Sequence, residues 1–351
     1  MAGSLFIFNS DNSMKKNQYV RFFKKIVIVL TILIIADQVT GRLMRHFYFN
    51  MVAGENYRTT FALDSLKSEI IIFGSSRASH HYVPGVFENK FKLTFYNAGR
   101  DGNYFLYSYA TFKAVTRRYT PKLIIFDLNP NEMIYRKSDY EGLSTHLPYY
   151  YYHPELKEII ELRSPFEKYK MFSATYPFNS QLIRIIFRNL SKARDTFNMG
   201  YLPLYGKIKN TKTEKALNDT TGVIDKYKIA ALNDITTYCK QRNISLIFVC
   251  SPVFSKSKES IGSKIAENIA NSDQSRYWDF SNDSVFNHHP EYFDDNLHLN
   301  DDGAKLFSAI ISNDIAKNIN RDFIHFNSLR VMLDSVGEKS IVAHQNSDIQ
   351  Y

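Results

Sequence analysis

Three residues at the ends of predicted elements have side chains suited to a nucleophile, a base and a group that orients the base. Ser76 follows the apolar run Ile70–Phe73 through Gly74, where small residues permit a sharp turn. Far downstream, Asp295 and His298 stand three positions apart, so one short loop or helical turn presents both side chains together. A serine becomes a strong nucleophile only when an adjacent base accepts its proton, and the base needs a partner that holds its ring. The sequence therefore predicts a serine hydrolase or acyltransferase.

The elements that must position these residues follow from the apolar pattern. Short apolar runs predict strands at 69–73, 93–96, 123–126, 244–249 and 277–280. Amphipathic segments predict helices at 104–118, 225–242 and 301–318. Strands that alternate with helices favour an α/β fold with a parallel sheet covered on both faces. Ligands bind such a sheet beyond the carboxyl ends of its strands, and Ser76 follows the first of them.

The interval 135–223 departs from this alternation, and we interpret it as an insertion that forms a wall or lid over the site. It is rich in Tyr and Phe, carries several prolines and has predicted helices at 155–162 and 181–193. Its run Tyr149–Tyr152 has two interpretations, a platform on which sugar rings stack and packing of the insertion onto the core. The C-terminal tail 321–351 has no clear pattern.

The most apolar stretch of the chain follows a group of cations. Ile26–Ala36 is apolar except for Thr31, and Arg21, Lys24 and Lys25 precede it, as expected of a cytoplasmic flank. The uninterrupted run is shorter than the roughly 20 residues that span a membrane, but lysine side chains can extend to the headgroups. We therefore predict a cytoplasmic tail, a transmembrane signal anchor and a linker, at 1–21, 22–40 and 41–65. A cleaved signal peptide and a buried soluble helix are the alternatives.

Composition and charge restrict the classes of protein to which the chain can belong. It has 351 residues, of which 44% are hydrophobic, and this excludes wholesale disorder. The net charge is +9, but no basic stripe interleaved with stacking aromatics is present, so nucleic acid is not an expected partner. We interpret Cys239 and Cys250 as core residues, with a disulfide as the alternative. The histidine pairs at 80–81 and 288–289 lack metal-ligand spacing, and no phosphate-binding glycine motif occurs, so neither a metal nor a cofactor is expected.

Four sequence blocks at the predicted strand ends and before the last helix resemble those of the SGNH (GDSL-type) hydrolase superfamily. They read Gly74-Ser75-Ser76, Asn97-Ala98-Gly99-Arg100-Asp101-Gly102, Asn129-Pro130-Asn131-Glu132 and Asp295-Asn296-Leu297-His298. The resemblance covers about residues 66–320, with the insertion outside it, and implies a flavodoxin-like three-layer α/β/α sandwich. It also implies Ser76 as the nucleophile, His298 as the general base and Asp295 as its orienting partner. The implied oxyanion hole consists of the N–H groups of Ser76 and Gly102 and the side-chain amide of Asn131.

The chain departs from the superfamily pattern in two blocks. Ser75 stands where the superfamily usually has Asp, which resembles the Gly-Ser-Ser of relatives that acylate envelope polysaccharides. The third block has Asn131 within Asn-Pro-Asn-Glu, where the superfamily has Gly-x-Asn-Asp. Gly99 competes with Gly102 for the oxyanion position, and the spacing favours Gly102. Arg77 is interpreted as a capping or salt-bridge residue, with binding of an anionic substrate group as the alternative.

The resemblance implies an ester hydrolase or O-acyl(acetyl)transferase that works through an acyl-serine. Its expected substrate is a cell-envelope or exported polysaccharide, and its expected partners include the membrane and an acyl-donating membrane protein. The expected location is the bacterial inner membrane, with the catalytic domain on the extracytoplasmic side. A small-ester or lipid esterase with the same triad is the second hypothesis. The third is a catalytically silent carbohydrate-binding or scaffold protein of an envelope export or acylation complex.

Overall fold

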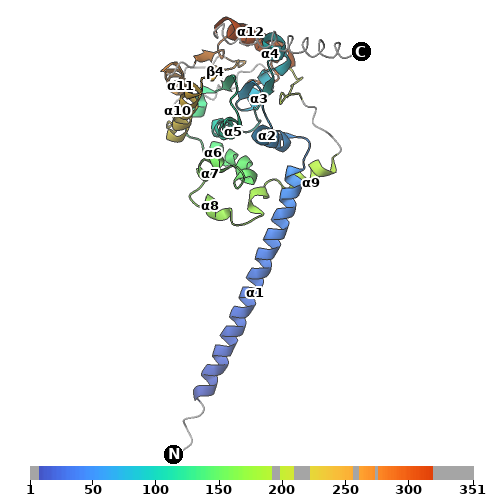
Figure 1. The fold of residues 1–351 in the computed structure, drawn as a ribbon, viewed down its shortest axis with the longest axis vertical. Helices are drawn as coiled ribbons and strands as arrows, with labels where there is room; N and C mark the ends of the chain where they lie inside the picture. The colour runs from blue at the N-terminus through green and yellow to red at the C-terminus, as the bar shows by residue number, and fades with distance from the viewer. Residues whose placement is uncertain (1–7, 192–197, 209–221, 256–260, 273–275, 319–351) are drawn as a thin grey trace, which may run out of the picture.

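Five short strands pair in parallel in the computed structural model, which describes residues 8–191, 198–208, 222–255, 261–272 and 276–318 (Figure 1). The strands are β1 (Ile70–Phe73), β2 (Phe95–Asn97), β3 (Leu123–Asp127), β4 (Ser245–Cys250) and β5 (Arg276–Asp279). They form one sheet in the order β2-β1-β3-β4-β5. Ile72 of β1 pairs with Asn97 of β2 on one side and with Ile125 of β3 on the other. The loops that follow these three strands therefore leave the sheet at neighbouring positions along one edge.

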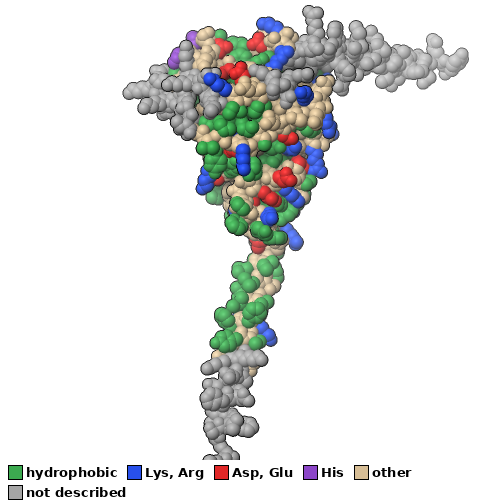
Figure 2. All heavy atoms as spheres, turned by 90° about the vertical axis from the view of Figure 1, so that its left-hand side faces the viewer, with side chains coloured by type: hydrophobic (Ala, Val, Ile, Leu, Met, Phe, Trp, Pro, Cys, Tyr) green, Lys and Arg blue, Asp and Glu red, His purple; other side chains and the backbone are tan. Residues whose placement is uncertain are grey.

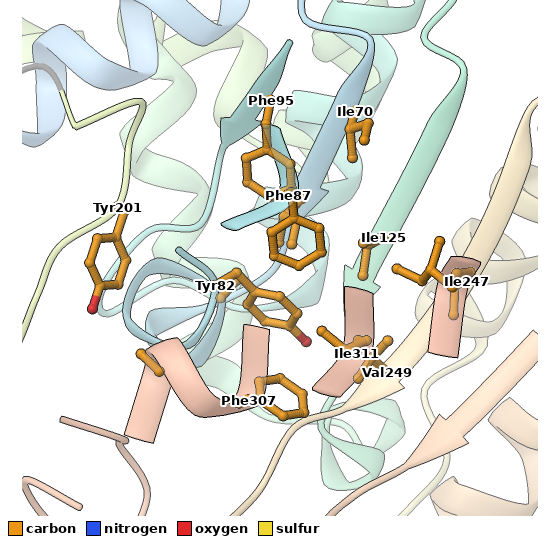
Figure 3. Packing of buried hydrophobic residues seen from close by; sticks show 14 of the residues in the cluster. Ile70, Tyr82, Phe87, Phe95, Ile125, Tyr201, Ile247, Val249, Phe307 and Ile311 are labelled. Carbon is orange, nitrogen blue, oxygen red and sulfur yellow. The ribbon is translucent and has the colours of Figure 1, made fainter. Parts of the chain in front are cut away.

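The sheet is the middle of three layers because its central strands are apolar on both faces. All residues of β1 and β3 are buried, as expected of parallel strands covered on both sides. Side chains alternate along β1, so Ile71 and Phe73 enter the core on one face and Ile70 and Ile72 the core on the other. Figure 3 shows the second of these cores, in which Tyr82 and Phe307 pack under the strands.

Helices cover both faces of the sheet. On one face lie α2 (Glu55–Asp64), α5 (Phe105–Arg118), α10 (Lys226–Gln241) and α11 (Ile261–Ser272). On the other lie α3 (Ser76–His81), α4 (Pro84–Phe91) and α12 (Asp301–Asn318). The predicted α/β fold with a parallel sheet and helices on both faces is confirmed. The ends of the predicted strands differ from the observed ends by at most two residues.

The insertion consists of short helices that build a third core against α5. Its helices are α6 (Lys137–Gly142), α7 (Lys157–Glu161), α8 (Glu167–Lys170) and α9 (Leu182–Leu190), with 3-10 turns η2 (Leu143–Tyr149), η3 (Pro154–Leu156) and η4 (Tyr176–Phe178). Two further 3-10 turns, η1 (Pro130–Met133) and η5 (Pro290–Tyr292), lie near the sheet. Tyr149 and Tyr150 are buried in the third core, whereas Tyr151 and Tyr152 are exposed. Parts of the predicted insertion and the tail 321–351 lie outside the described residues.

The N-terminal helix α1 (Phe8–Phe49) projects from the domain as a long stalk (Figure 1). The segment 41–65 was predicted as a linker, but it consists mainly of the last turns of α1 and the whole of α2. It packs on the insertion and on α5. The end of α1 packs on the domain because one side of the helix forms a contact face. The residues of this face are spaced to lie on one side of the helix: Asp37, Gly41, Met44 and Tyr48.

Within the described residues, no helix is both long enough and apolar enough to cross a membrane. The prediction of a transmembrane helix over 22–40 is at odds with this finding.

Candidate active site

Ser76 lies at the carboxyl end of β1 because Gly74 allows a sharp change of direction there. A Cβ atom on Gly74 would lie 2.7 Å from Cβ of Ala78 and 2.9 Å from the carbonyl oxygen of Asp127, so a larger residue would force the turn apart. Ser76 is then the first residue of α3, and its side chain is partly exposed.

A hydrogen-bonded chain connects Ser76, His298 and Asp295, as the sequence predicted. Nε2 of His298 lies 2.7 Å from Oγ of Ser76, and Nδ1 lies 2.8 Å from Oδ2 of Asp295. A carboxylate only accepts hydrogen bonds, so Nδ1 of His298 carries a proton that it donates to Asp295. Nε2 of the neutral ring is therefore the acceptor for the Ser76 hydroxyl. This is the tautomer that a general base for serine requires.

The short loop that carries Asp295 and His298 is closed by backbone pairing. Phe293 and Leu299 form an antiparallel bridge, and the N–H of Asp294 donates to the carbonyl of His298 (2.9 Å). Within this loop, Oδ1 of Asp295 accepts the N–H groups of Leu297 (2.7 Å) and His298 (2.9 Å). Partial burial would raise the pKa of Asp295, but the hydrogen bonds from the His298 ring and from these N–H groups lower it below its ordinary value. Asp295 is therefore an anion that orients the ring of His298.

His81 supports the same loop from the protein interior. Its Nε2 accepts the N–H of Leu299 (3.0 Å), so the proton of the neutral ring is on Nδ1, which lies 2.9 Å from Oγ of Ser251. Burial, together with the positive charges that His298 and Arg77 can carry, lowers the pKa of His81 well below its ordinary value. His81 thus stays neutral and fixes the backbone next to His298. The adjacent pair His80-His81 pointed in the sequence only to a metal site, so this role of His81 was missed.

Gly102 and Asn131 follow the two strands that flank β1. Gly102 lies in the turn after β2 with φ of 67°, and its missing Cβ would meet no atom within 4 Å, so its backbone faces open space. Gly99, the competing residue, is enclosed, since a Cβ there would overlap the backbone of Ser79 and the side chain of Ala78. Gly99 thus serves close packing of the loop on α3, which favours Gly102 for the oxyanion position. Asn131 lies in η1 directly after β3, on the opposite side of β1.

Two buried groups beside η1 and α3 have a structural role. Arg77 forms an ion pair with Asp127 of β3, with Nη2 and Oδ1 3.1 Å apart and both side chains buried. Arg77 also donates to the carbonyl of Ser251 (3.3 Å), which favours its interpretation as a salt-bridge residue. Glu132, next to Asn131, is buried, and burial raises its pKa to about 8 despite the attraction of Arg77. Glu132 is therefore a neutral acid at neutral pH.

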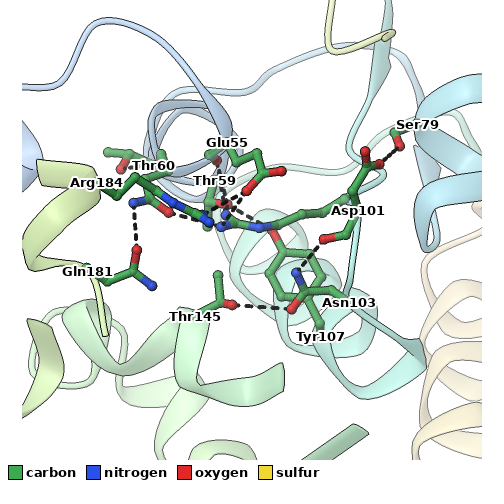
Figure 4. A network of polar contacts seen from close by, with 12 residues as sticks. Glu55, Thr59, Thr60, Ser79, Asp101, Asn103, Tyr107, Thr145, Gln181 and Arg184 are labelled. Carbon is green, nitrogen blue, oxygen red and sulfur yellow. Dashed lines mark hydrogen bonds and ion pairs between the residues drawn. The ribbon is translucent and has the colours of Figure 1, made fainter. Parts of the chain in front are cut away.

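The β2–α5 loop, residues 98–104, is held from three sides (Figure 4). From α3, the hydroxyl of Ser79 and Nε2 of His80 (3.0 Å) bond to the carboxylate of Asp101. From the insertion, the hydroxyl of Thr145 donates to Oδ1 of Asn103 (3.2 Å). From α2, several acceptors bind the guanidinium of Arg100, among them the carbonyl of Glu55, Oδ1 of Asn56 and the hydroxyl of Thr59. The loop residues that make these contacts lie on both sides of Gly102 in the sequence. The contacts therefore fix the position of Gly102 relative to Ser76.

His80 is an imidazolium ion in this arrangement. Its Nδ1 lies 2.6 Å from the carbonyl oxygen of Leu202 and its Nε2 lies 3.0 Å from Oδ2 of Asp101, and both oxygens only accept hydrogen bonds. Burial would lower the pKa of His80, but its bonds to Asp101 and Leu202 and the charge of Asp295 raise it above 6.5. The ring also meets that of His298 edge to face, with centroids 5.4 Å apart. The sequence does contain a signal that His80 lies near the site. It follows Ser76 by four residues, and this spacing places both on one side of a helix.

We expect the replacement His80→Gln to weaken the protein in a pH-dependent way. Because the folded pKa of His80 is raised, its contribution to stability is complete below pH 6.5 and is lost as the pH rises through the folded pKa. The pKa of Asp101 is lowered by its bonds to His80 and Ser79 despite burial, so its contribution is lost only as the pH falls below 3.8. The difference in unfolding free energy between wild type and variant should therefore be largest near pH 5 to 6 and shrink toward pH 9. Urea unfolding across this range measures it.

If a fluorophosphonate labels Ser76, the rate of labelling gives a second readout for His80. The ratio of the wild-type rate to the His80→Gln rate should fall toward one at high pH, because His80 of the wild type is then also neutral. The ratio is used because titrations common to both proteins cancel in it. His289→Gln is the control, since His289 also pairs with a carboxylate, Glu291 (3.0 Å), but both side chains are exposed. A constant ratio across the pH range would contradict the assignment of His80 as a cation that positions the loop.

The described residues contain no group of three or more His, Cys, Asp or Glu side chains arranged to hold a metal ion. Cys239 and Cys250 are buried and free, as the interpretation of both as core residues predicted. No protein-family model matches the chain, and no curated protein matches it.

Proposed function

We propose that this protein is a serine-dependent acyl-transfer enzyme, an ester hydrolase or O-acyltransferase with Ser76 as its nucleophile. The observation that carries the proposal is the hydrogen-bonded chain from Ser76 through His298 to Asp295. The serine lies at the carboxyl end of a strand in a parallel sheet, where ligands of such sheets bind. Asp295 is held as an anion, and His298 has the tautomer that accepts a proton from serine.

The proposed reaction has two symmetrical halves. Oγ of Ser76 attacks the ester carbonyl while Nε2 of His298 takes the hydroxyl proton, and the tetrahedral intermediate then collapses as His298 gives that proton to the leaving alcohol. In the second half, His298 deprotonates water or a sugar hydroxyl, which attacks the acyl-serine. The bond between the acyl carbon and Oγ then breaks as His298 returns the proton to Oγ, which releases an acid or a new ester and restores Ser76. Gly102, Asn131 and the N–H of Ser76 would stabilise the oxyanion, with about 3 kcal/mol of barrier from each donor.

The substrate class we propose is an acylated cell-envelope or exported polysaccharide. Support comes from Tyr135, an exposed aromatic side chain two residues after η1, the turn that carries Asn131. Aromatic rings with polar edges suit sugar rings, because the ring face covers apolar C–H groups and the hydroxyl is a hydrogen-bonding group. An acyl-donating membrane protein as partner and an extracytoplasmic location stay predictions.

Membrane association through α1 is a second part of this proposal. The apolar side chains from Phe22 to Ile35 are between 38% and 66% exposed all around the helix. Exposed apolar surface of this extent marks a site of interaction. Arg21, Lys24 and Lys25 beside it would meet anionic headgroups.

Covalent labelling of the full chain tests the catalytic proposal. We expect one fluorophosphonate adduct, detected by intact mass and mapped to Ser76, that disappears in Ser76→Ala and falls sharply in His298→Ala. Ser75→Ala is the matched control and should keep the adduct, since its side chain makes no capping hydrogen bond to α3. If the chain has native circular dichroism but forms no adduct, the result contradicts the proposal. It would favour the silent carbohydrate-binding or scaffold protein instead. Competition between water and sugar acceptors for the acyl-serine then separates esterase from transferase.

A further inference from the structure

Exposed apolar side chains gather on the part of the insertion next to α1. Phe166, Tyr169 and Phe172 in and beside α8, and Ile183, Phe187 and Leu190 of α9, are each between 56% and 77% exposed. Apolar residues on an ordinary soluble surface are scattered singly, whereas these six lie within 25 residues of the chain. On the face drawn in Figure 2, green side chains run along the stalk and reappear on the part of the domain nearest to it.

Hydrogen bonds fix the segment that follows α8 at the end of the apolar stretch of α1. The carboxylate of Asp37, the first residue after Ile26–Ala36, accepts the hydroxyl of Ser173 (2.7 Å), the N–H of Ala174 (2.7 Å) and both donors of Thr175. Although partial burial would raise the pKa of Asp37, these hydrogen bonds lower it to about 2, so the contact persists at every physiological pH. The segment that carries Phe172 is thus held beside the last apolar residues of α1.

A second contact fixes α9 against the last turn of α1. Nδ2 of Asn189 donates to the carbonyl of Phe47 (3.0 Å), and Figure 1 shows α9 at the junction of stalk and domain. Only Ile185 of α9 is buried, whereas Ile183 and Phe187 are turned away from the protein. A short helix that exposes most of its apolar residues has little stability of its own in water, so a second apolar partner would stabilise it.

The charges of this region suit anionic lipid. Between residues 164 and 190 the sequence has four cations, Lys168, Lys170, Arg184 and Arg188, and one carboxylate, Glu167. Glu167 is buried and paired with Arg163 and Lys170, and Arg184 is paired with Glu55 (2.8 Å), so the excess positive charge rests on Lys168 and Arg188. Exposed aromatic and aliphatic side chains mixed with Lys and Arg are the features of helices that lie in the headgroup region of a bilayer.

We propose that α8, α9 and the turns beside them form a lipid-docking face, with which the domain rests on an anionic membrane next to α1. This inference rests on the proposed membrane association of α1 and adds a second, separate contact. Its consequence is that the bilayer fixes the orientation of the whole domain, and with it the direction in which the edge bearing Ser76 faces.

Site-specific fluorescence of the full chain tests the docking face. Cys239 and Cys250 are buried, so a cysteine introduced by Phe172→Cys or Phe187→Cys can be labelled selectively with an environment-sensitive dye. On addition of vesicles of phosphatidylcholine and phosphatidylglycerol, we expect a blue shift at both positions. Vesicles whose lipids carry a quencher at shallow depth should lower the emission about twofold, because interfacial helices lie within reach of that depth. Val285→Cys, exposed in the loop between β5 and η5, is the matched control and should show neither change.

Each other outcome decides against the docking face. If the chain floats with vesicles but neither label changes, α1 alone contacts the lipid and the proposal fails. If the chain does not float, both membrane proposals fail. A shift that appears without lipid as the protein concentration rises identifies a second copy as the partner. The adduct at Ser76, measured in the same samples, reports separately on the catalytic proposal.

Discussion

Replacing His298 with alanine is expected to slow acylation of Ser76 by a factor of about 10⁴ to 10⁶, and combining this change with Ser76→Ala should cost little more. Among the hydrogen bonds of the described residues, Nε2 of His298 is the base in contact with Oγ of Ser76, at 2.7 Å. Residues that act as one unit give strongly non-additive losses, because removal of either partner already abolishes the step. Rates of hydrolysis of an activated acetyl ester by the single and double variants measure this.

The orienting role of Asp295 is tested by comparing the rate loss of an Asp295 variant with that of His298→Ala in the same experiment. Asp295→Asn keeps the shape of the side chain but lets the ring of His298 adopt the wrong tautomer, so we expect a loss of about 10⁴. His289→Ala, at an exposed histidine outside the triad, is the control and should leave the rate unchanged. A His298→Ala rate within tenfold of wild type would show that another group activates Ser76.

The second large effect is expected at Asp127, with a loss of about 3 to 5 kcal/mol in the free energy of unfolding for Asp127→Ala. Asp127 forms a buried ion pair with Arg77 (3.1 Å) and accepts the hydroxyl of Tyr82 (2.8 Å). The variant leaves a buried guanidinium without its counter-charge and a buried hydroxyl without its acceptor, and both cost free energy. Urea unfolding followed by circular dichroism measures the loss.

Two further variants separate this explanation from a general sensitivity to substitution. In the double variant Arg77→Met with Asp127→Leu neither charge is left behind, so it should be more stable than Asp127→Ala alone. Glu141→Ala removes an exposed ion pair with Lys137 (3.3 Å) and should change the free energy by less than about 1 kcal/mol. Equal losses for all three variants would contradict a buried-charge mechanism.

Much of the sheet could be predicted from the sequence because its signals are local. Apolar runs such as Ile70–Phe73 and Leu123–Phe126 end at Gly, Asn or Pro within a few residues, and the strands and breaks appear within two residues of where the pattern placed them. The pairing of Asp295 with His298 was predictable for the same reason, since their spacing alone brings them together. The contact of His298 with Ser76 depends on parallel strands ending at one edge, which the alternation of strands and helices predicts.

Features that depend on contacts between distant segments could not be predicted in this way. The docking of α1 needs Asp37 to meet Ser173–Thr175, more than 130 residues later, and nothing near Asp37 in the sequence reveals that partner. The segment 41–65 therefore looked like a linker, although it is helical and packed. The bond between His80 and Asp101 joins α3 to the next strand's loop and was missed because adjacent histidines were considered only as metal ligands.

The position of Arg100 bears on where the domain that carries the proposed site begins. Its guanidinium is buried, and acceptors supplied by α2 at Glu55, Asn56 and Thr59 bind it. A chain shortened to begin at about residue 66, shortly before β1, would lose all three acceptors and leave a buried cation two residues from Gly102. The domain that contains the sheet is thus not expected to fold stably without α2. The helices before the sheet belong to the same cooperative body as the site, and its natural boundary lies on the N-terminal side of Glu55.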